Sequence, residues 1–393
     1  MGKTNTLISR ISIIFLSIIC TFAVLELLGR KILPKPQTIA IENLHVGPTG
    51  NGPVLDKIGL SAPDIFYRTP TGLRLRPNVR GIIDGHDLSK KRVSFSTNSL
   101  GYRHEELRFK TDTDVRILAV GDSITFQEYL PLEETYPFQV EKYIREHPPA
   151  SLTGKQVDVI NAGVGMIGSE NELAILMETG LSVRPDIVLV EMYLNDARES
   201  FSLKLIKTPP LLQKSYLINS LVHTVNILRA KQLEHQKTNE EVNREGVHFI
   251  TVNPIDRISS ASWQTSKPAF NRLIAEYFQD WGYAWSDTHW KKMEEVFRLM
   301  KELSIEHKFQ LVVALFPVRY QVESAILEDW PGQQFSLLMN KLNITHIDLL
   351  PILRKKFNDD TINLYYDSAH PTASGSAFIG SEIGKFFIEN NIL

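Results

Sequence analysis

Residues Val115-Arg-Ile-Leu-Ala-Val-Gly-Asp-Ser-Ile-Thr125 decide the fold. Their first part, Val115 to Val120, is mostly aliphatic on both faces, which is typical of a strand buried inside a parallel sheet. The apolar run ends at Gly121, and a stretch with helical character, Glu133 to Arg145, follows. Ser123 is therefore expected at the carboxyl end of a strand, where open α/β sheets bind their ligands. A serine there can act as a nucleophile, or it can simply cap a turn.

A short motif near the far end of the chain, Asp367-Ser-Ala-His370-Pro, favours the nucleophile. An Asp and a His three residues apart on one turn can meet, so that the carboxylate accepts the imidazole Nδ1–H. The Nε2 atom of His370 is then free to accept a proton from a serine. Because surface turns often contain Asp-x-x-His, this motif has meaning only in combination with Ser123.

Two further segments lie between these motifs, and both end in hydrogen-bond donors. Val159-Ile-Asn-Ala-Gly-Val-Gly-Met-Ile-Gly168 is an aliphatic strand that ends in glycines. Val188-Leu-Val-Glu-Met-Tyr-Leu-Asn-Asp196 is an aliphatic strand that ends in an amide side chain. Backbone N–H groups and amide side chains at such strand ends can donate hydrogen bonds to a developing oxyanion.

In this order, the four motifs resemble those of the SGNH/GDSL hydrolase family. The resemblance implies that Ser123 is the nucleophile and that Asp367 and His370 complete the catalytic triad. It also implies an oxyanion hole, formed by the N–H of the nucleophile, a backbone N–H of the loop from Gly163 to Gly168, and the amide of Asn195. The implied enzyme is a serine hydrolase that acts on ester bonds.

One position departs from the family pattern. Counting without gaps from Asn161 places Met166 where the family usually has its oxyanion glycine, with Gly165 and Gly168 on either side. The donor in question is a backbone N–H, which methionine also has. This loop therefore supplies the donor from Gly165 or from Met166. The resemblance covers about residues 92–392, apart from one insertion.

Composition and charge limit the other functions that the chain can have. It has 393 residues, with 43 Lys and Arg against 45 Asp and Glu. This length fits two domains or one α/β domain with insertions, and the charge balance gives no chain-wide field that would attract nucleic acid. The single Cys20 excludes a disulfide framework within one chain, and no Cys/His cluster or HExxH spacing indicates a metal site. We expect metal-free chemistry without a cofactor.

An apolar run from Ile11 to Leu28 is long enough, as a helix, to span roughly the bilayer core. Basic residues flank both ends, so the charges say little about orientation. A cleaved signal peptide is the main alternative, with Thr21-Phe-Ala23 as a poor cleavage site, and a buried core helix is another. We expect a single-pass anchor in the bacterial inner (cell) membrane, with the catalytic domain in the periplasm or outside the cell.

The predicted organisation is a membrane anchor at 1–33, a linker at 34–63, a β-rich lead-in at 64–110 and an SGNH hydrolase domain at 111–393. The linker is rich in Pro, Gly and Asn. In the lead-in, Leu73 to Asn78 and Val93 to Arg103 alternate like strands that end in turns. For Arg103 itself we expect a structural role, as for most lone arginines.

The hydrolase domain is expected to be a flavodoxin-like, three-layer α/β/α fold with a five-stranded parallel sheet. Its predicted strands are Val115–Val120, Val157–Asn161, Asp186–Glu191, Gln310–Phe316 and Thr345–Leu349. A helix is predicted over Asp287–Leu303, because its apolar residues follow a helical stripe and Asp287 can cap its start. The last helix is predicted over Ala373–Glu389.

Residues from about 197 to 286 form a helical insertion that a minimal member of the family would not need. Four of the five tryptophans of the chain fall between positions 263 and 290. On a lid beside the site, Trp263, Trp281 and Trp285 could stack on sugar rings or bind an acyl chain. Packing of the insertion is the more common role of such a cluster.

These observations predict a serine esterase that hydrolyses O-acetyl or other short acyl esters on an envelope carbohydrate or lipid, for example an acetylated polysaccharide. Acyl transfer to a polysaccharide hydroxyl is a close alternative, because a sugar can capture an acyl-enzyme as well as water can. A membrane-anchored assembly or interaction protein that keeps the fold is a third. The joint presence of Ser123, Asn195, Asp367 and His370 argues against that third reading.

Overall fold

The computed structural model describes residues 53–197, 260–278, 280–326, 329–360 and 362–393, with parts of 13–31 and 215–221. The chain divides into two compact units. Residues 1–43 and 204–237 form the smaller unit, and residues 44–203 and 238–393 form the larger one. The segments predicted as lead-in and hydrolase domain therefore fall mainly in one unit.

The larger unit is built around a five-stranded sheet whose neighbouring strands all run parallel, in the order β10-β9-β8-β6-β7. The strands are β6 (Val115–Val120), β7 (Val157–Asn161), β8 (Ile187–Tyr193), β9 (Gln310–Phe316) and β10 (Thr345–Asp348). All of β8 is buried, as expected for a central strand covered on both faces. The predicted flavodoxin-like parallel sheet is confirmed. Strand β8 continues past its predicted end at Glu191, because its last residues still pair with β9.

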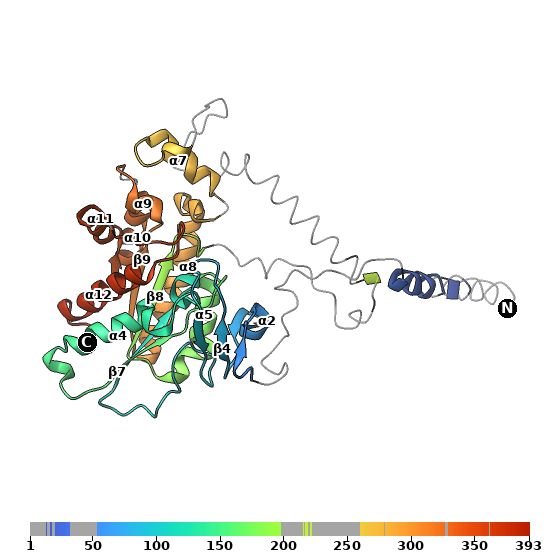
Figure 1. Cartoon of the computed structure of the whole chain (residues 1–393), viewed down its shortest axis with the longest axis horizontal. Helices are drawn as coiled ribbons and strands as arrows, with labels where there is room; N and C mark the ends of the chain where they lie inside the picture. Colours follow the sequence, from blue (N-terminus) through green and yellow to red (C-terminus); the bar gives the residue numbers. More distant parts are fainter. Residues whose placement is uncertain are drawn as a thin grey trace, which may run out of the picture. The chain divides into compact units, whose positions relative to one another are not determined.

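Helices lie on both sides of the sheet (Figure 1). The main ones are α4 (Tyr136–Glu146), α5 (Ser169–Glu178), α8 (Asp287–His307), α10 (Trp330–Lys341), α11 (Leu350–Asp359) and α12 (Ala373–Glu389). Helix α4 packs against α12, whereas α5 packs against α8 and α8 packs against α10. The strand order reverses at β6, and the right-handed rule for connections between parallel strands then puts these two groups of helices on opposite faces. The result is the expected α/β/α arrangement.

Helix α12 approaches α4 closely because glycine lies in its inner face. A Cβ atom at Gly380 would lie 2.5 Å from the Cβ of Gln139 and 2.8 Å from the carbonyl oxygen of Tyr136. A larger residue would therefore push the two helices apart. The bounds predicted for this last helix, Ala373 and Glu389, are those observed.

The helix predicted over Asp287–Leu303 is α8, and Met293 and Phe297 of its apolar stripe are buried. The predicted cap at Asp287 was wrong. The capping residue is Ser286, whose Oγ accepts the backbone N–H of His289, because the backbone of Ser286 is still extended. Asp287 is the first helical residue, where its negative charge still favours the helix N-terminus.

Small sheets precede the catalytic sheet. Their strands are β1 (Lys57–Ile58), β2 (Phe66–Thr69), β3 (Gly72–Leu75), β4 (Arg80–Ile83) and β5 (Val93–Ser96), with the short helix α2 (Ala62–Ile65) between β1 and β2. Strands β2 and β3 form an antiparallel hairpin that is tied to α5. The Asn171 side chain donates to the carbonyl oxygen of Thr71 at 2.6 Å, and Arg74 pairs with Glu178 at 2.8 Å.

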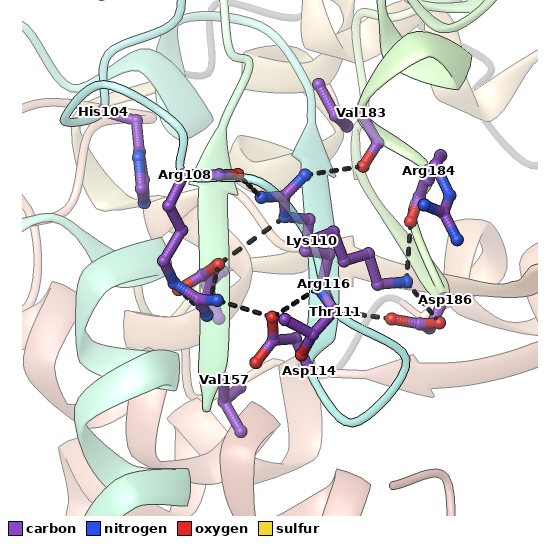
Figure 2. A network of polar contacts seen from close by, with 12 residues as sticks. His104, Arg108, Lys110, Thr111, Asp114, Arg116, Val157, Val183, Arg184 and Asp186 are labelled. Atoms are coloured by element: carbon purple, nitrogen blue, oxygen red, sulfur yellow. Dashed lines mark hydrogen bonds and ion pairs between the residues drawn. The ribbon is translucent and has the colours of Figure 1, made fainter. Parts of the chain in front are cut away.

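Charged side chains gather where β6, β7 and β8 begin (Figure 2). Arg108 lies between two carboxylates, 2.5 Å from Asp114 and 3.1 Å from Asp158. The Nζ atom of Lys110 lies 2.6 Å from the carboxylate of Asp186. This network joins the segment that leads into β6 to the amino ends of the strands, at the end of the sheet opposite the predicted nucleophile.

Within the predicted insertion, the structure describes residues 260–278 and 280–286, which form the 3-10 turn η5 (Ser260–Ser262), α7 (Lys267–Glu276) and the 3-10 turn η6 (Trp281–Trp285). Trp281 and Trp285 are 0% and 2% exposed, and Trp281 stacks on Tyr277 with ring centroids 5.1 Å apart. These two tryptophans therefore pack the insertion and cannot form a sugar platform. Trp263 stays partly exposed. The helical pattern in the first half of the insertion lies almost wholly outside the described residues.

In the smaller unit, residues 20–31 are helical. Glu26 of this helix accepts hydrogen bonds from the hydroxyl of Ser215 at 2.8 Å and the backbone N–H of Leu217 at 3.0 Å. Of the helices in the part of the chain that the structure describes, none has the length and apolar character needed to cross a membrane. The anchor predicted at 11–28 lies partly outside the described residues and stays a prediction. The linker predicted at 34–63 also lies partly outside them, but its last residues, from Lys57, are already paired with β4 in the small sheet.

Candidate active site

Ser123 lies on the turn that follows β6. It is the first residue of α3 (Ser123–Phe126), and Asp122 caps this helix by accepting the backbone N–H of Ile124 at 2.8 Å. A Cβ atom at Gly121 would lie 2.4 Å from a carboxylate oxygen of Glu191, so only glycine fits at this point. The Gly-Asp-Ser motif therefore gives the turn its space, its helix cap and its hydroxyl.

The hydroxyl of Ser123 meets the imidazole of His370. The Oγ atom lies 3.0 Å from Nε2, and the Nδ1 atom of the same ring lies 2.8 Å from Oδ2 of Asp367. The other carboxylate oxygen, Oδ1, accepts the backbone N–H groups of Ala369 and His370, each at 2.8 Å. The three side chains thus stand in the order nucleophile, base and carboxylate that removal of a proton from a serine requires.

The hydrogen bond between Asp367 and His370 sets the protonation of both. Burial alone would raise the pKa of Asp367, but the hydrogen bonds that it accepts from His370 and the backbone lower it to about 2. Burial opposes the charged form of His370, yet Asp367 offsets this and raises the pKa of His370 above its ordinary value. Asp367 is therefore ionised at neutral pH and stabilises the imidazolium that forms when His370 accepts a proton.

The loop that carries the base is fixed by its neighbours. The backbone N–H of Arg319, the first residue of α9 (Arg319–Glu323), donates to the carbonyl oxygen of Ser368 at 2.9 Å. The N–H of Tyr366 donates to the carbonyl oxygen of His370 at 2.8 Å. The ring of Tyr129 meets the imidazole of His370 edge to face, with centroids 5.5 Å apart. These contacts hold the imidazole in position for Ser123.

Arg103 fixes the segment that follows the nucleophile. It is 1% exposed, and its guanidinium donates to the backbone carbonyl oxygens of Phe126 at 2.9 Å, of Gln127 at 2.5 Å, and of Leu130. Burial lowers its pKa to about 10, so the group is still charged at neutral pH. Its contacts are with the backbone, which is the structural role that we expected.

The loop after β7 runs beside the nucleophile turn, because the N–H of Val164 donates to the carbonyl oxygen of Gly121 at 3.1 Å. Within the described ranges, no protein acceptor meets the N–H of Gly165 or Met166, so either can donate to an oxyanion. Met166 has φ 61°, and half of it is exposed. This left-handed conformation costs a residue with a side chain roughly 1 kcal/mol, and glycine adopts it freely.

Asn195 follows β8 at the carboxyl edge of the sheet. Its Nδ2 donates to Oδ1 of Asp280 at 2.9 Å, and its own Oδ1 is buried with no hydrogen-bond partner in the part of the chain described. The second hydrogen of the amide stays available for an oxyanion. Sequence reasoning missed Asp280, which lies in the insertion, 85 positions from Asn195 and outside every motif.

Four buried carboxyl groups lie near the nucleophile turn: Asp122, Glu172, Glu191 and Asp196. Glu191 accepts the backbone N–H of Asp122 at 3.2 Å and the hydroxyl of Thr125 at 3.1 Å. Burial raises the pKa of all four groups, that of Asp122 to about 6, and repulsion by neighbouring carboxylates raises the pKa of Glu172, Glu191 and Asp196 further. Glu191 thus stabilises the nucleophile turn through these two hydrogen bonds. Across the described residues, no three His, Cys, Asp or Glu side chains are arranged to hold a metal ion.

Comparison with known proteins gives few matches in sequence and several in structure. No family model matches the chain. An arylesterase of Vibrio mimicus is 31% identical over 91 residues, which are 23% of this chain and 42% of the arylesterase. The match therefore spans less than half of that relative.

Two solved structures illustrate the similarity of fold. A two-domain esterase active on acetylated mannans has 13% identity and a TM-score of 0.39, with 70% of this chain and 49% of that chain covered. A G-D-S-L family protein from Desulfitobacterium hafniense DCB-2 has 12% identity and a TM-score of 0.35, with 69% and 98% covered. In its four motifs, and in the contacts of Ser123, His370 and Asp367, the chain resembles the SGNH/GDSL hydrolases.

Proposed function

We propose that the protein is a serine esterase that hydrolyses O-acetyl or other short acyl esters, with an envelope carbohydrate or lipid as the acyl carrier. The observation that carries the proposal is the contact chain from Ser123 through His370 to Asp367, with distances of 3.0 and 2.8 Å. The description of the Vibrio mimicus relative as an arylesterase is in keeping with an ester substrate.

The geometry suits acyl transfer in two steps. The Oγ atom of Ser123 attacks the carbonyl carbon of the ester while Nε2 of His370 takes the hydroxyl proton, and Asp367 holds the ring by its Nδ1–H. The tetrahedral oxyanion receives hydrogen bonds from the backbone N–H of Ser123 and from the N–H of Gly165 or Met166. The amide of Asn195 is the third donor.

The tetrahedral intermediate then collapses to an acyl-enzyme, which water hydrolyses in the second step. His370 returns its proton to the leaving alcohol, which departs and leaves an acyl-enzyme on Ser123. Water, activated by the same imidazole, attacks the acyl carbon and releases the acid. A sugar hydroxyl in place of water would make the reaction a transfer. With an acetylated polysaccharide as donor and a sugar as acceptor, release of free acetate indicates hydrolysis and formation of an acetylated acceptor indicates transfer.

The membrane anchor at residues 11–28 is part of the proposal, with the catalytic unit in the periplasm or outside the cell. The described part of this run, within helical residues 20–31, exposes apolar side chains such as Phe22, Val24 and Leu27, which supports contact with lipid. The full chain should stay in the membrane fraction after a carbonate wash. Protease added to intact spheroplasts should cut the catalytic unit, whereas protection would reverse the orientation.

The test of the catalytic proposal is covalent labelling. A fluorophosphonate probe should modify Ser123, and mass spectrometry locates the adduct. Ser123→Ala and His370→Ala should each lower ester turnover by roughly three orders of magnitude or more with the melting temperature preserved. An adduct on another serine, or turnover that survives both changes, would exclude the assigned triad.

A further inference from the structure

The insertion reaches the candidate oxyanion hole through one hydrogen bond. The Nδ2 atom of Asn195 lies 2.9 Å from Oδ1 of Asp280, which stands immediately before η6. Asp280 has no ion-pair partner in the described ranges. Burial raises the pKa of Asp122, and the nearby carboxylate of Asp280 adds to this effect. A carboxylate here repels a developing oxyanion, so its presence needs a reason other than charge stabilisation.

The chemistry of the amide supplies that reason. A carboxamide has a donor end and an acceptor end of nearly the same shape, and rotation by 180° exchanges them. An ionised carboxylate only accepts, so Asp280 selects the orientation in which the nitrogen of Asn195 faces it. One hydrogen is then used by Asp280, and the other can serve the oxyanion. Without this acceptor, nothing among the described residues fixes which end of the amide faces the hole, because Oδ1 of Asn195 has no partner.

The backbone of Asp280 is fixed beside the aromatic cluster of the insertion. The backbone N–H of Asp280 donates to the carbonyl oxygen of Tyr277 at 2.9 Å. The next residue, Trp281, is fully buried between Tyr277 and Trp285, with ring centroids 5.1 and 5.9 Å away. Its ring also lies 5.5 Å from that of Tyr320, in α9. The same helix donates a hydrogen bond to the loop of the catalytic base, so the cluster connects both sides of the site.

We propose that Asp280 is a positioning residue of the oxyanion hole, which orients the amide of Asn195 for catalysis. The proposal rests on the proposed esterase function. The insertion then contributes to catalysis through Asp280, whose position is fixed next to the buried Trp281.

The test compares Asp280→Ala with Asp280→Asn on p-nitrophenyl acetate. Asp280→Ala removes the acceptor and should lower kcat by about 10- to 100-fold with little change in KM, because the donor matters once charge develops. Asp280→Asn keeps a side-chain oxygen but adds a donor end, so the two carboxamides can pair in either orientation and kcat should lie between those of the Ala variant and the unchanged protein. Glu276→Ala, an exposed carboxylate change on the same insertion, is the matched control and should leave both parameters unchanged.

A double variant separates positioning from a structural role. In an Asn195→Ala background, Asp280→Ala should cause no further loss of kcat, because the group that it orients is gone. Additive losses, equal impairment of the Ala and Asn variants, or Asp280→Ala within about threefold of the unchanged protein would each overturn the proposal. Melting temperatures of all variants show whether the fold is intact.

The two proposals fail in different ways. Absence of turnover that depends on Ser123 would end the esterase proposal alone. The contact is tested without turnover by selective ¹⁵N labelling of asparagine, with the side-chain amide signals of Asn195 assigned from their loss in Asn195→Ala. Asp280→Ala should shift these signals and Glu276→Ala should not. Unchanged signals would overturn the positioning role even in an active enzyme.

Discussion

Replacing Arg103 tests how the nucleophile segment is held. The guanidinium makes three charge-assisted hydrogen bonds to buried carbonyl oxygens, worth about 1.5–3 kcal/mol each, or roughly 5–9 kcal/mol together. Burial opposes them: the fall of the Arg103 pKa from 12.5 to about 10 corresponds to roughly 3 kcal/mol. The difference, about 2–6 kcal/mol, is what Arg103→Met should remove from the free energy of unfolding.

The assay is calorimetry and urea unfolding of the full chain in detergent. For a unit of this size, a loss near 4 kcal/mol should lower the melting temperature by about 6 °C. Arg103→Lys should be intermediate, because one ammonium group cannot reproduce the planar fork that meets three carbonyl oxygens.

Arg108→Met is the comparison at the opposite end of the sheet. Arg108 pairs with two carboxylates, but 38% of its side chain is exposed, so its loss should cost about 1 kcal/mol or less. If Arg103→Met cost no more than Arg108→Met, the reasoning from buried carbonyl oxygens would be refuted.

Three further predictions concern pH, backbone conformation and the tryptophans. His370 must be neutral to accept a proton, so kcat/KM should be highest above the pKa of His370 and fall as the pH drops through it. Because Asp367 raises that pKa, this acid limb of the pH profile should lie above about pH 6.5. Asp367→Asn should move the limb to lower pH and lower the plateau by about 10⁴-fold, and an unmoved limb would contradict the assignment. Met166→Gly relieves a left-handed φ of 61°, so it should leave kcat within a few-fold and keep or slightly raise the melting temperature; abolished turnover would show that the side chain itself is needed. Trp281→Ala should cost about 3–5 kcal/mol and affect all esters alike, whereas Trp263→Ala should raise KM on an acetylated polysaccharide and spare p-nitrophenyl acetate; equal losses on both esters for Trp263→Ala would end its role as a sugar platform.

Most of the fold could be predicted from local patterns in the sequence. The five strands were predictable because buried parallel strands are continuous aliphatic runs, and the last helix because His370-Pro371 precedes a clear apolar period. The cap of α8 was not predictable to the residue: Ser286 and Asp287 are both good caps, and only the backbone angles decide between them.

The candidate site, too, has residues that could be predicted from local motifs and residues that depend on tertiary contacts. Ser123, Asp367 and His370 lie in short motifs, so their meeting could be expected before their distances were known. Asp280 and the three carbonyl contacts of Arg103 could not be found, because each depends on a tertiary approach between segments far apart in the chain. A lone Asp or Arg in a sequence gives no indication of the residue that it will meet.

The packing of α12 on α4 has a consequence for the order in which the site is assembled during synthesis. Ser123 and α4 are made early, but the loop with Asp367 and His370, and the helix that covers α4, are made late. Any N-terminal fragment that ends before Asp367 therefore carries the serine without its base, and leaves open the face of α4 that α12 covers in the complete fold. Such a fragment has no esterase activity and exposes apolar surface. An unfinished chain is therefore recognised by chaperones and proteases before its active site is complete.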